Sequence, residues 1–152
     1  MIGATHVSCQ TFVAAPPRVV YRWFTEPDKL VQWIGVSATL EPRPGGLFRF
    51  EILPGEFCTG RYVELVPDRR VVFTWGWESG AIPVPPGSST VEVTLEATRD
   101  GTQVNLIHRD LAPEARALHA DGWARFLPRL AAAVVGRDPG PDPAREGLPA
   151  RP

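Results

Sequence analysis

The segment VVFTWGWE, residues 71–78, decides how the rest of this chain can fold. Phe73, Trp75 and Trp77 occupy alternate positions in it, with small residues between them. Because successive side chains of a β-strand point to opposite faces, the three rings point the same way and form one apolar wall. Two interpretations are open: the rings fill an ordinary core, or they line a cavity that holds an apolar or aromatic ligand.

Other segments after residue 35 show the same two-residue period. They are VSATLEP (36–42), LFRFEI (47–52), TGRYVELV (59–66), TVEVTLEA (90–97) and TQVNLIH (102–108). Turn sequences such as RPGG (43–46) and DG (100–101) separate them. With the 71–78 segment they predict six antiparallel strands in a meander that has one buried and one solvated face.

A further strand and two short helices are expected before the meander. THVSCQTFVAA (5–15) is rich in β-forming residues and ends at two prolines. RVVYRWF (18–24) carries apolar residues at helical spacing. TEPDKLVQWIG (25–35) has helix signals, with Thr25 as the N-cap, Asp28 three residues later and a terminating glycine.

One long helix is predicted from Pro113 to about Gly136. Its apolar stripe consists of His119, Trp123, Phe126, Leu127, Leu130 and Val134. Pro128 lies inside this helix and removes one backbone hydrogen bond, so we expect a kink near Ala124.

The order of these elements predicts an α+β helix-grip fold, with a curved seven-stranded antiparallel sheet around the C-terminal helix. Two short helices join the first and second strands. Residues 1–137 are expected to form this single domain. Residues 138–152 contain five prolines and few apolar residues, so we expect a Pro-rich, disordered tail.

The balance of basic and acidic residues gives no support for a strongly anionic binding partner. The chain has 16 basic and 17 acidic residues, which gives no indication of binding to nucleic acid or to an anionic membrane. No apolar run approaches the roughly 18 residues of a membrane span. The first residues lack a basic start followed by an apolar run, so the expected location is the cytoplasm.

Several of these segments together resemble a known family. They are AAPPRVVYRWFTEPDKLVQWIG, RPGGLFRFEI, GRYVELVPDRRVVFTWGWE, GSSTVEVTLEATRDGTQVNLIHRDL and HADGWARFLPRLA, which span about residues 6–136. In this order they resemble the Activator of Hsp90 ATPase homologue 1-like (AHSA1-like) family of the START-like, or SRPBCC, superfamily. The resemblance implies a Bet v 1-like helix-grip fold that serves as a scaffold for hydrophobic ligands. The chain departs from the family pattern at Ile34, where a second tryptophan often follows the equivalent of Trp33.

A cavity between the sheet and the long helix is the expected ligand site. The candidate ligand-binding residues are Trp33, Phe48, Phe50, Tyr62, Phe73, Trp75, Trp77, His108, His119, Trp123 and Phe126. Trp75 and Trp123 are expected on opposite sides of the cavity. No metal or cofactor is expected.

His108 is a weak candidate for catalysis. It shares its face with apolar residues of the last strand, where it acts either as a general acid/base or as a neutral, hydrogen-bonded core residue. A metal site of His108, Asp110 and His119 matches no recognised zinc spacing. Ser88 and Ser89 are expected in a loop without an assigned base, and no G-x-S-x-G motif is present.

Three functions remain open from the sequence. The first is binding of a hydrophobic or aromatic small molecule without catalysis. The second is an enzyme on the same scaffold, such as a cyclase, aromatase or hydrolase. The third is a chaperone-associated role, as the family name suggests, and a homodimer is left open in each case.

Overall fold

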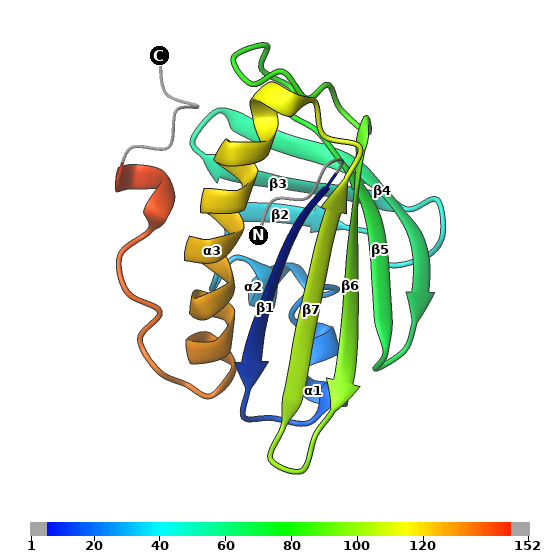
Figure 1. Ribbon diagram of the computed structural model, residues 1–152, viewed down its shortest axis with the longest axis vertical. Helices are drawn as coiled ribbons and strands as arrows, with labels where there is room; N and C mark the ends of the chain where they lie inside the picture. Colours follow the sequence, from blue (N-terminus) through cyan, green and yellow to red (C-terminus); the bar gives the residue numbers. More distant parts are fainter. Residues whose placement is uncertain (1–5, 147–152) are drawn as a thin grey trace.

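The computed structural model describes residues 6–146, which form one curved sheet and its covering helices (Figure 1). The strands are β1 (His6–Val13), β2 (Ser37–Leu40), β3 (Leu47–Leu53), β4 (Glu56–Val66), β5 (Arg70–Trp75), β6 (Ser89–Ala97) and β7 (Thr102–Arg109). The helices are α1 (Pro17–Arg22), α2 (Pro27–Leu30), α3 (Pro113–Val134) and the short 3₁₀ helix η1 (Pro143–Glu146).

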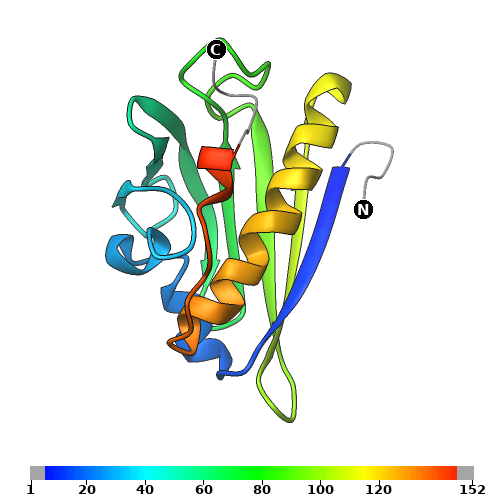
Figure 2. The same ribbon diagram turned by 90° about the vertical axis from the view of Figure 1, so that its left-hand side faces the viewer.

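All strand pairs in this part of the chain are antiparallel, in the order β1-β7-β6-β5-β4-β3-β2. The six later strands form the expected meander, and β1 joins it beside β7. Figure 2 shows α3 lying across the concave side of the sheet. The predicted helix-grip fold is therefore confirmed.

The curvature of the sheet is concentrated at β4. The register shifts between Glu51 and Leu53 where β3 meets β4, and between Tyr62 and Glu64 where β4 meets β5. Such irregularities bend a strand and increase its twist. In Figure 1, β2 and β3 run across the direction of β5, β6 and β7, and β4 bends from one direction to the other. The bend at β4 creates the concave side against which α3 packs.

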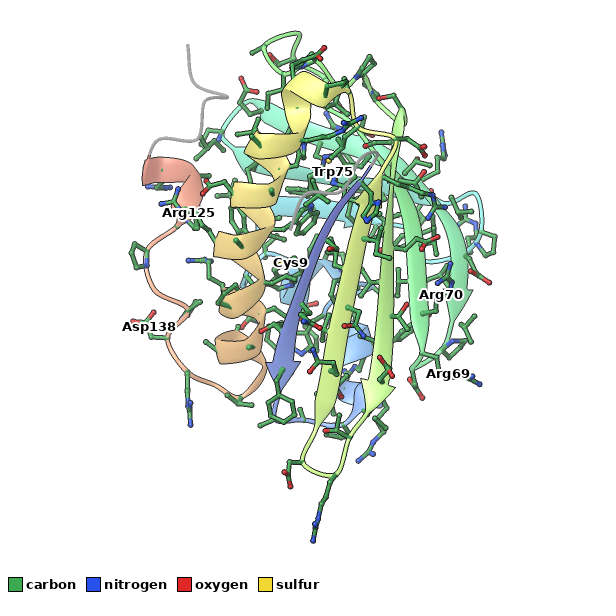
Figure 3. All side chains as sticks on the ribbon, viewed as in Figure 1. Cys9, Arg69, Arg70, Trp75, Arg125 and Asp138 are labelled. Carbon is green, nitrogen blue, oxygen red and sulfur yellow. The ribbon has the colours of Figure 1, made fainter. Side chains whose placement is uncertain are left out.

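The two faces of the sheet differ in polarity, as the alternation predicted. Every second residue of β6 from Ser89 to Leu95 is buried. On the outer face, the Arg70 guanidinium (labelled in Figure 3) lies 2.6 Å from Glu64 and 3.2 Å from Glu92, and Arg109 also pairs with Glu92. Solvated ion pairs of this kind contribute little stability, so the fold depends on the inner face.

Helix α3 continues unbroken through Pro128. Pro128 and Ala124, whose carbonyl loses its usual partner, are both exposed. Water can therefore bond the free carbonyl, which lowers the cost of the proline. The kink expected near Ala124 stays a prediction.

The second short helix is shorter than predicted. Helix α2 covers only Pro27–Leu30, and its N-cap is Glu26 rather than Thr25, without a side-chain cap. The Thr25 hydroxyl instead donates to the Tyr21 carbonyl at 3.3 Å. Thr25 thus closes the end of α1, and the prediction that it caps the next helix is wrong.

The C-terminal segment, defined here as residues 138–146, also differs from the expected disordered tail. After α3 the chain turns back and runs alongside the helix (Figures 1 and 2). Pro143 and Ala144 are buried at the start of η1, which contacts both α3 and β3. The remainder of the predicted tail, 147–152, and Thr5 of the predicted first strand lie outside the described residues.

Arg129 of α3 connects this segment to the rest of the fold. Its Nη1 donates to the carbonyls of Gly140 at 2.7 Å and Pro141 at 2.8 Å, and its Nε donates to the Trp33 carbonyl at 3.0 Å. A charged donor forms stronger hydrogen bonds than a neutral one. The segment is therefore held by polar contacts that its proline-rich composition does not indicate.

Gly76 allows a close approach between the end of β5 and the following loop. The Trp77 amide donates to the Val84 carbonyl at 2.7 Å, which brings residues 84–86 against the strand end. A Cβ on Gly76 would collide with the carbonyl oxygen of Pro85. The close approach of this loop is therefore a physical reason for glycine at position 76.

We expect Gly76→Ala to lower the free energy of unfolding by about 1–3 kcal/mol, because the loop must move away from the strand. Urea unfolding measures this loss. Gly80→Ala in the same loop is the control, since nothing lies within 4 Å of a Cβ there; it should change stability by less than about 0.5 kcal/mol. Equal effects of the two substitutions would contradict the close approach.

Candidate functional site

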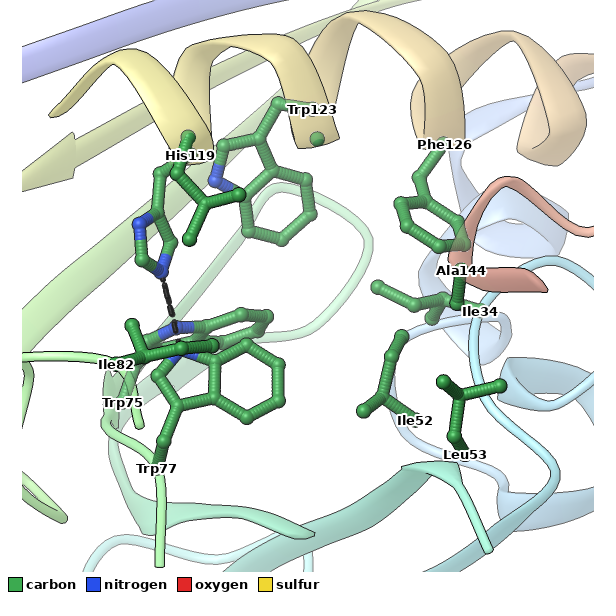
Figure 4. Close-up of a pocket in the computed structure, with 12 residues that line it drawn as sticks. Ile34, Ile52, Leu53, Trp75, Trp77, Ile82, His119, Trp123, Phe126 and Ala144 are labelled. Carbon is green, nitrogen blue, oxygen red and sulfur yellow. Dashed lines mark hydrogen bonds between the residues drawn. The ribbon is translucent and has the colours of Figure 1, made fainter. Parts of the chain in front are cut away.

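A small cavity of about 50 Å³ lies between α3, the sheet and the C-terminal segment (Figure 4). Its wall is made almost wholly of carbon atoms. It is lined by Ile34, Ile52, Leu53, Trp75, Trp77, Ile82, Leu118, His119, Gly122, Trp123, Phe126 and Ala144. Strand, helix, loop and C-terminal segment thus all contribute to one apolar space.

Indole rings form one side of this cavity. The Trp75 ring lies 5.1 Å from the Trp123 ring and 5.5 Å from the Trp77 ring, centroid to centroid. Figure 4 shows these rings together on one side, with Phe126 and Ala144 among the residues on the other. The expectation that Trp75 and Trp123 face each other across the cavity is therefore wrong, because the two rings are in contact.

Five of the eleven predicted ligand residues lie at the cavity wall: Trp75, Trp77, His119, Trp123 and Phe126. The other six are buried elsewhere in the core. Phe48, Phe50, Tyr62 and Phe73 form an aromatic cluster, in which the Phe48 and Phe73 rings stack at 4.0 Å. Binding by any of the eleven stays a prediction.

Trp33 and Tyr62 have structural hydrogen bonds. The Trp33 indole donates to the Trp23 carbonyl at 3.2 Å, and the Tyr62 hydroxyl donates to the Phe24 carbonyl at 2.8 Å. Both side chains are buried. Trp33 connects the ends of the two short helices, Tyr62 connects the end of α1 to β4, and neither lines the cavity.

The sequence reasoning missed seven residues of the wall, most of them aliphatic: Ile34, Ile52, Leu53, Ile82, Leu118, Gly122 and Ala144. Ile52 follows the alternation of its strand and could have been found that way. Ile82 and Ala144 belong to segments whose composition predicts exposure. Their burial depends on tertiary contacts that no local pattern reveals.

His119 is a polar side chain of the cavity wall and is hydrogen-bonded to two of the indoles (dashed lines in Figure 4). Its Nδ1 lies 2.8 Å from the Ala115 carbonyl oxygen, which only accepts, so Nδ1 carries the proton. Its Nε2 accepts from Trp77 Nε1 at 3.1 Å and from Trp75 Nε1 at 3.3 Å. His119 is therefore a neutral acceptor shared by two indoles.

His108 is buried beside this group, behind the cavity wall. Its Nδ1 accepts from the Trp123 indole at 3.0 Å, so its proton is on Nε2. Nε2–H donates to the Ser89 hydroxyl at 2.8 Å, and that hydroxyl donates to the Trp75 carbonyl at 2.8 Å. This chain of hydrogen bonds joins α3 to β7, β6 and β5.

Both histidines are held in the neutral form. Burial lowers the pKa of His108 well below its ordinary value, and the nearby His119 lowers it further. Burial also lowers the pKa of His119, although its hydrogen bond to Ala115 acts in the opposite direction. A low pKa and an occupied lone pair leave neither imidazole ready to take a proton.

Among the described residues, the lone pairs that His108 and His119 would need as bases already accept hydrogen bonds from indoles. Ser89 begins β6 rather than lying in a loop without a base, and His108 is its neighbour. The direction of the hydrogen bonds nevertheless prevents His108 from activating it, because His108 donates to Ser89. Among residues 6–146, no group of three or more His, Cys, Asp or Glu side chains could hold a metal ion.

The family comparison agrees with the fold. The family model described as Activator of Hsp90 ATPase homolog 1-like protein matches residues 14–135. An AHSA1-like protein of Rhizobium etli is 40% identical, with a TM-score of 0.71, over 94% of this chain and 92% of that one. The chain belongs to the AHSA1-like family.

Two further solved structures are similar. CalU16 of Micromonospora echinospora is 25% identical, with a TM-score of 0.70, over 92% of this chain and 80% of that one. The Aha1 dimer of Colwellia psychrerythraea is 20% identical, with a TM-score of 0.72, over 88% and 96%, and it supports the fold alone. The curated proteins include no match. No helix within the described part of the chain is long and apolar enough to cross a membrane.

The neutral histidines predict that stability falls in acid. Their pKa values are lowered in the folded state, so below about pH 6.5 the unfolded chain binds protons that the folded chain does not. Two such groups lower the free energy of unfolding by at most about 2.7 kcal/mol between pH 7.5 and pH 5.5, the limit in which neither is protonated in the folded state.

Urea unfolding at the two pH values measures this fall. In His119→Gln, which keeps an acceptor for an indole, the fall should be about half as large. An identical fall in wild type and variant would show that His119 does not titrate in the way its contacts imply.

Proposed function

We propose that this protein binds a neutral, apolar or aromatic small molecule in the cavity and leaves it chemically unchanged. The observation that carries the proposal is a carbon wall in which the nearby polar atoms are already hydrogen-bonded to one another. Such a site offers apolar contact and ring stacking but no polar group that requires a partner. It therefore favours ligands that need no hydrogen bond.

The family supports the same class of ligand. Its fold commonly serves as a scaffold for hydrophobic ligands, although one fold hosts many functions. The geometry gives less support to catalysis, because the Nδ1 lone pair that His108 would use as a base already accepts a hydrogen bond from Trp123. No contact of the described residues favours a chaperone-associated role over binding.

The size of the cavity implies that binding requires movement. A cavity of about 150 Å³ holds benzene in an engineered protein, and the cavity here is about 50 Å³. The C-terminal segment, which contributes Ala144, is held to α3 by hydrogen bonds from the Arg129 side chain and not by strand pairing. We propose that displacement of this segment enlarges the cavity and admits the ligand.

Arg129 should control the rate of entry. In Arg129→Gln the C-terminal segment loses its charged donor, so a ligand should associate roughly tenfold faster, which corresponds to about 1.4 kcal/mol of lost hydrogen bonding. Stopped-flow fluorescence with N-phenyl-1-naphthylamine, a neutral dye that brightens in apolar surroundings, measures this rate.

Arg116→Gln is the matched control. Arg116 also lies on α3, and its Nε donates to a backbone carbonyl just before the helix, that of Leu111, rather than to one in the C-terminal segment. Its removal should leave dye association within about twofold of wild type. Absence of dye binding by both wild type and Arg129→Gln would sink the proposed function. Binding at equal rates would reject only the entry route.

A further inference from the structure

Gly122 lines the cavity without contributing a side chain to its wall. It lies on α3 one helical turn from Leu118 and one turn from Phe126, and all three line the cavity. Residues spaced by four lie next to one another along a helix face. Between two large side chains, the wall at Gly122 is therefore bare helix backbone.

Neither conformation nor packing requires glycine at this position. Gly122 is inside a regular helix, and a Cβ built on it would have nothing within 4 Å. This is the reverse of Gly76, where the backbone of the following loop excludes any side chain. Glycine destabilises a helix interior relative to alanine, so the chain retains a less favourable residue where a larger one would fit.

Gly122 is half-buried and lines the cavity next to two buried rings. The indole ring of Trp123, the next residue, is 4% exposed and packs on Trp75. Phe126, one turn further along, is 3% exposed. A side chain at position 122 would therefore lie beside these two buried rings of the cavity wall.

We infer that Gly122 sets the upper size of the ligand, whose edge packs on the exposed backbone of α3 at this position. The ligand class that fits is a planar, neutral aromatic compound of more than one ring, held between the indoles and the helix. The inference rests on the proposed function, and it adds a residue that selects among apolar ligands by size.

Two substitutions at Gly122 test this inference with benzene and naphthalene as probes. Gly122→Ala should raise the melting temperature by about 2–4 °C and weaken naphthalene binding at least tenfold, while benzene binding stays within about twofold. Gly122→Leu should bind neither probe. NMR titration of each protein gives the affinities, and Ala124→Leu, on the exposed side of the same helix, is the control that should bind both probes as wild type does.

Each other outcome has a defined meaning. A lower melting temperature of Gly122→Ala would overturn the inference, because glycine would then be required by packing. Naphthalene binding by folded Gly122→Leu with wild-type affinity would overturn it while leaving the proposed function intact. If wild type binds neither probe, the proposed function fails together with the inference.

Discussion

The hydrogen bonds between three indoles and two neutral imidazoles fix α3 on the sheet. Trp75 and Trp77 donate to His119 of the helix, and Trp123 of the helix donates to His108 of β7. Indole nitrogen only donates, so a buried tryptophan needs an acceptor, and neutral histidine supplies one without introducing charge. These groups can meet only if the sheet curves around α3, and their contact forms the aromatic wall.

The same interaction explains why the polar atoms beside the cavity already have hydrogen-bond partners. Each histidine places its proton on the nitrogen that faces an oxygen and its lone pair on the nitrogen that faces an indole. A ligand in the cavity therefore contacts the carbon atoms of the rings. A histidine would have to give up an existing hydrogen bond before it could act as a base. The geometry that stabilises the helix on the sheet is thus the reason for proposing binding rather than catalysis.

The sequence predicted the parts of the fold that repeat and missed those that depend on single contacts. Two-residue alternation identified the strands, and helical spacing identified α3 and its inward residues His119 and Trp123. Neither signal reaches the C-terminal segment, because its position depends on hydrogen bonds from the Arg129 side chain to the carbonyls of Gly140 and Pro141. The apolar wall was predicted from its rings, whereas Ile82 and Ala144 lie in proline-rich segments where composition gives no sign of burial.

The cavity is small because the indole rings pack against one another and therefore leave little open space. Native interiors are close-packed, so a rigid wall of this kind leaves little room for a ligand. Room has to come from a part of the wall that is held weakly or from a position where the chain omits a side chain. The C-terminal segment meets the first condition, because side-chain hydrogen bonds from Arg129 hold it where no strand pairing does. Gly122 meets the second, and it lies on α3, which the histidine–indole hydrogen bonds connect to the sheet, so we expect the space beside it to persist if the segment is displaced.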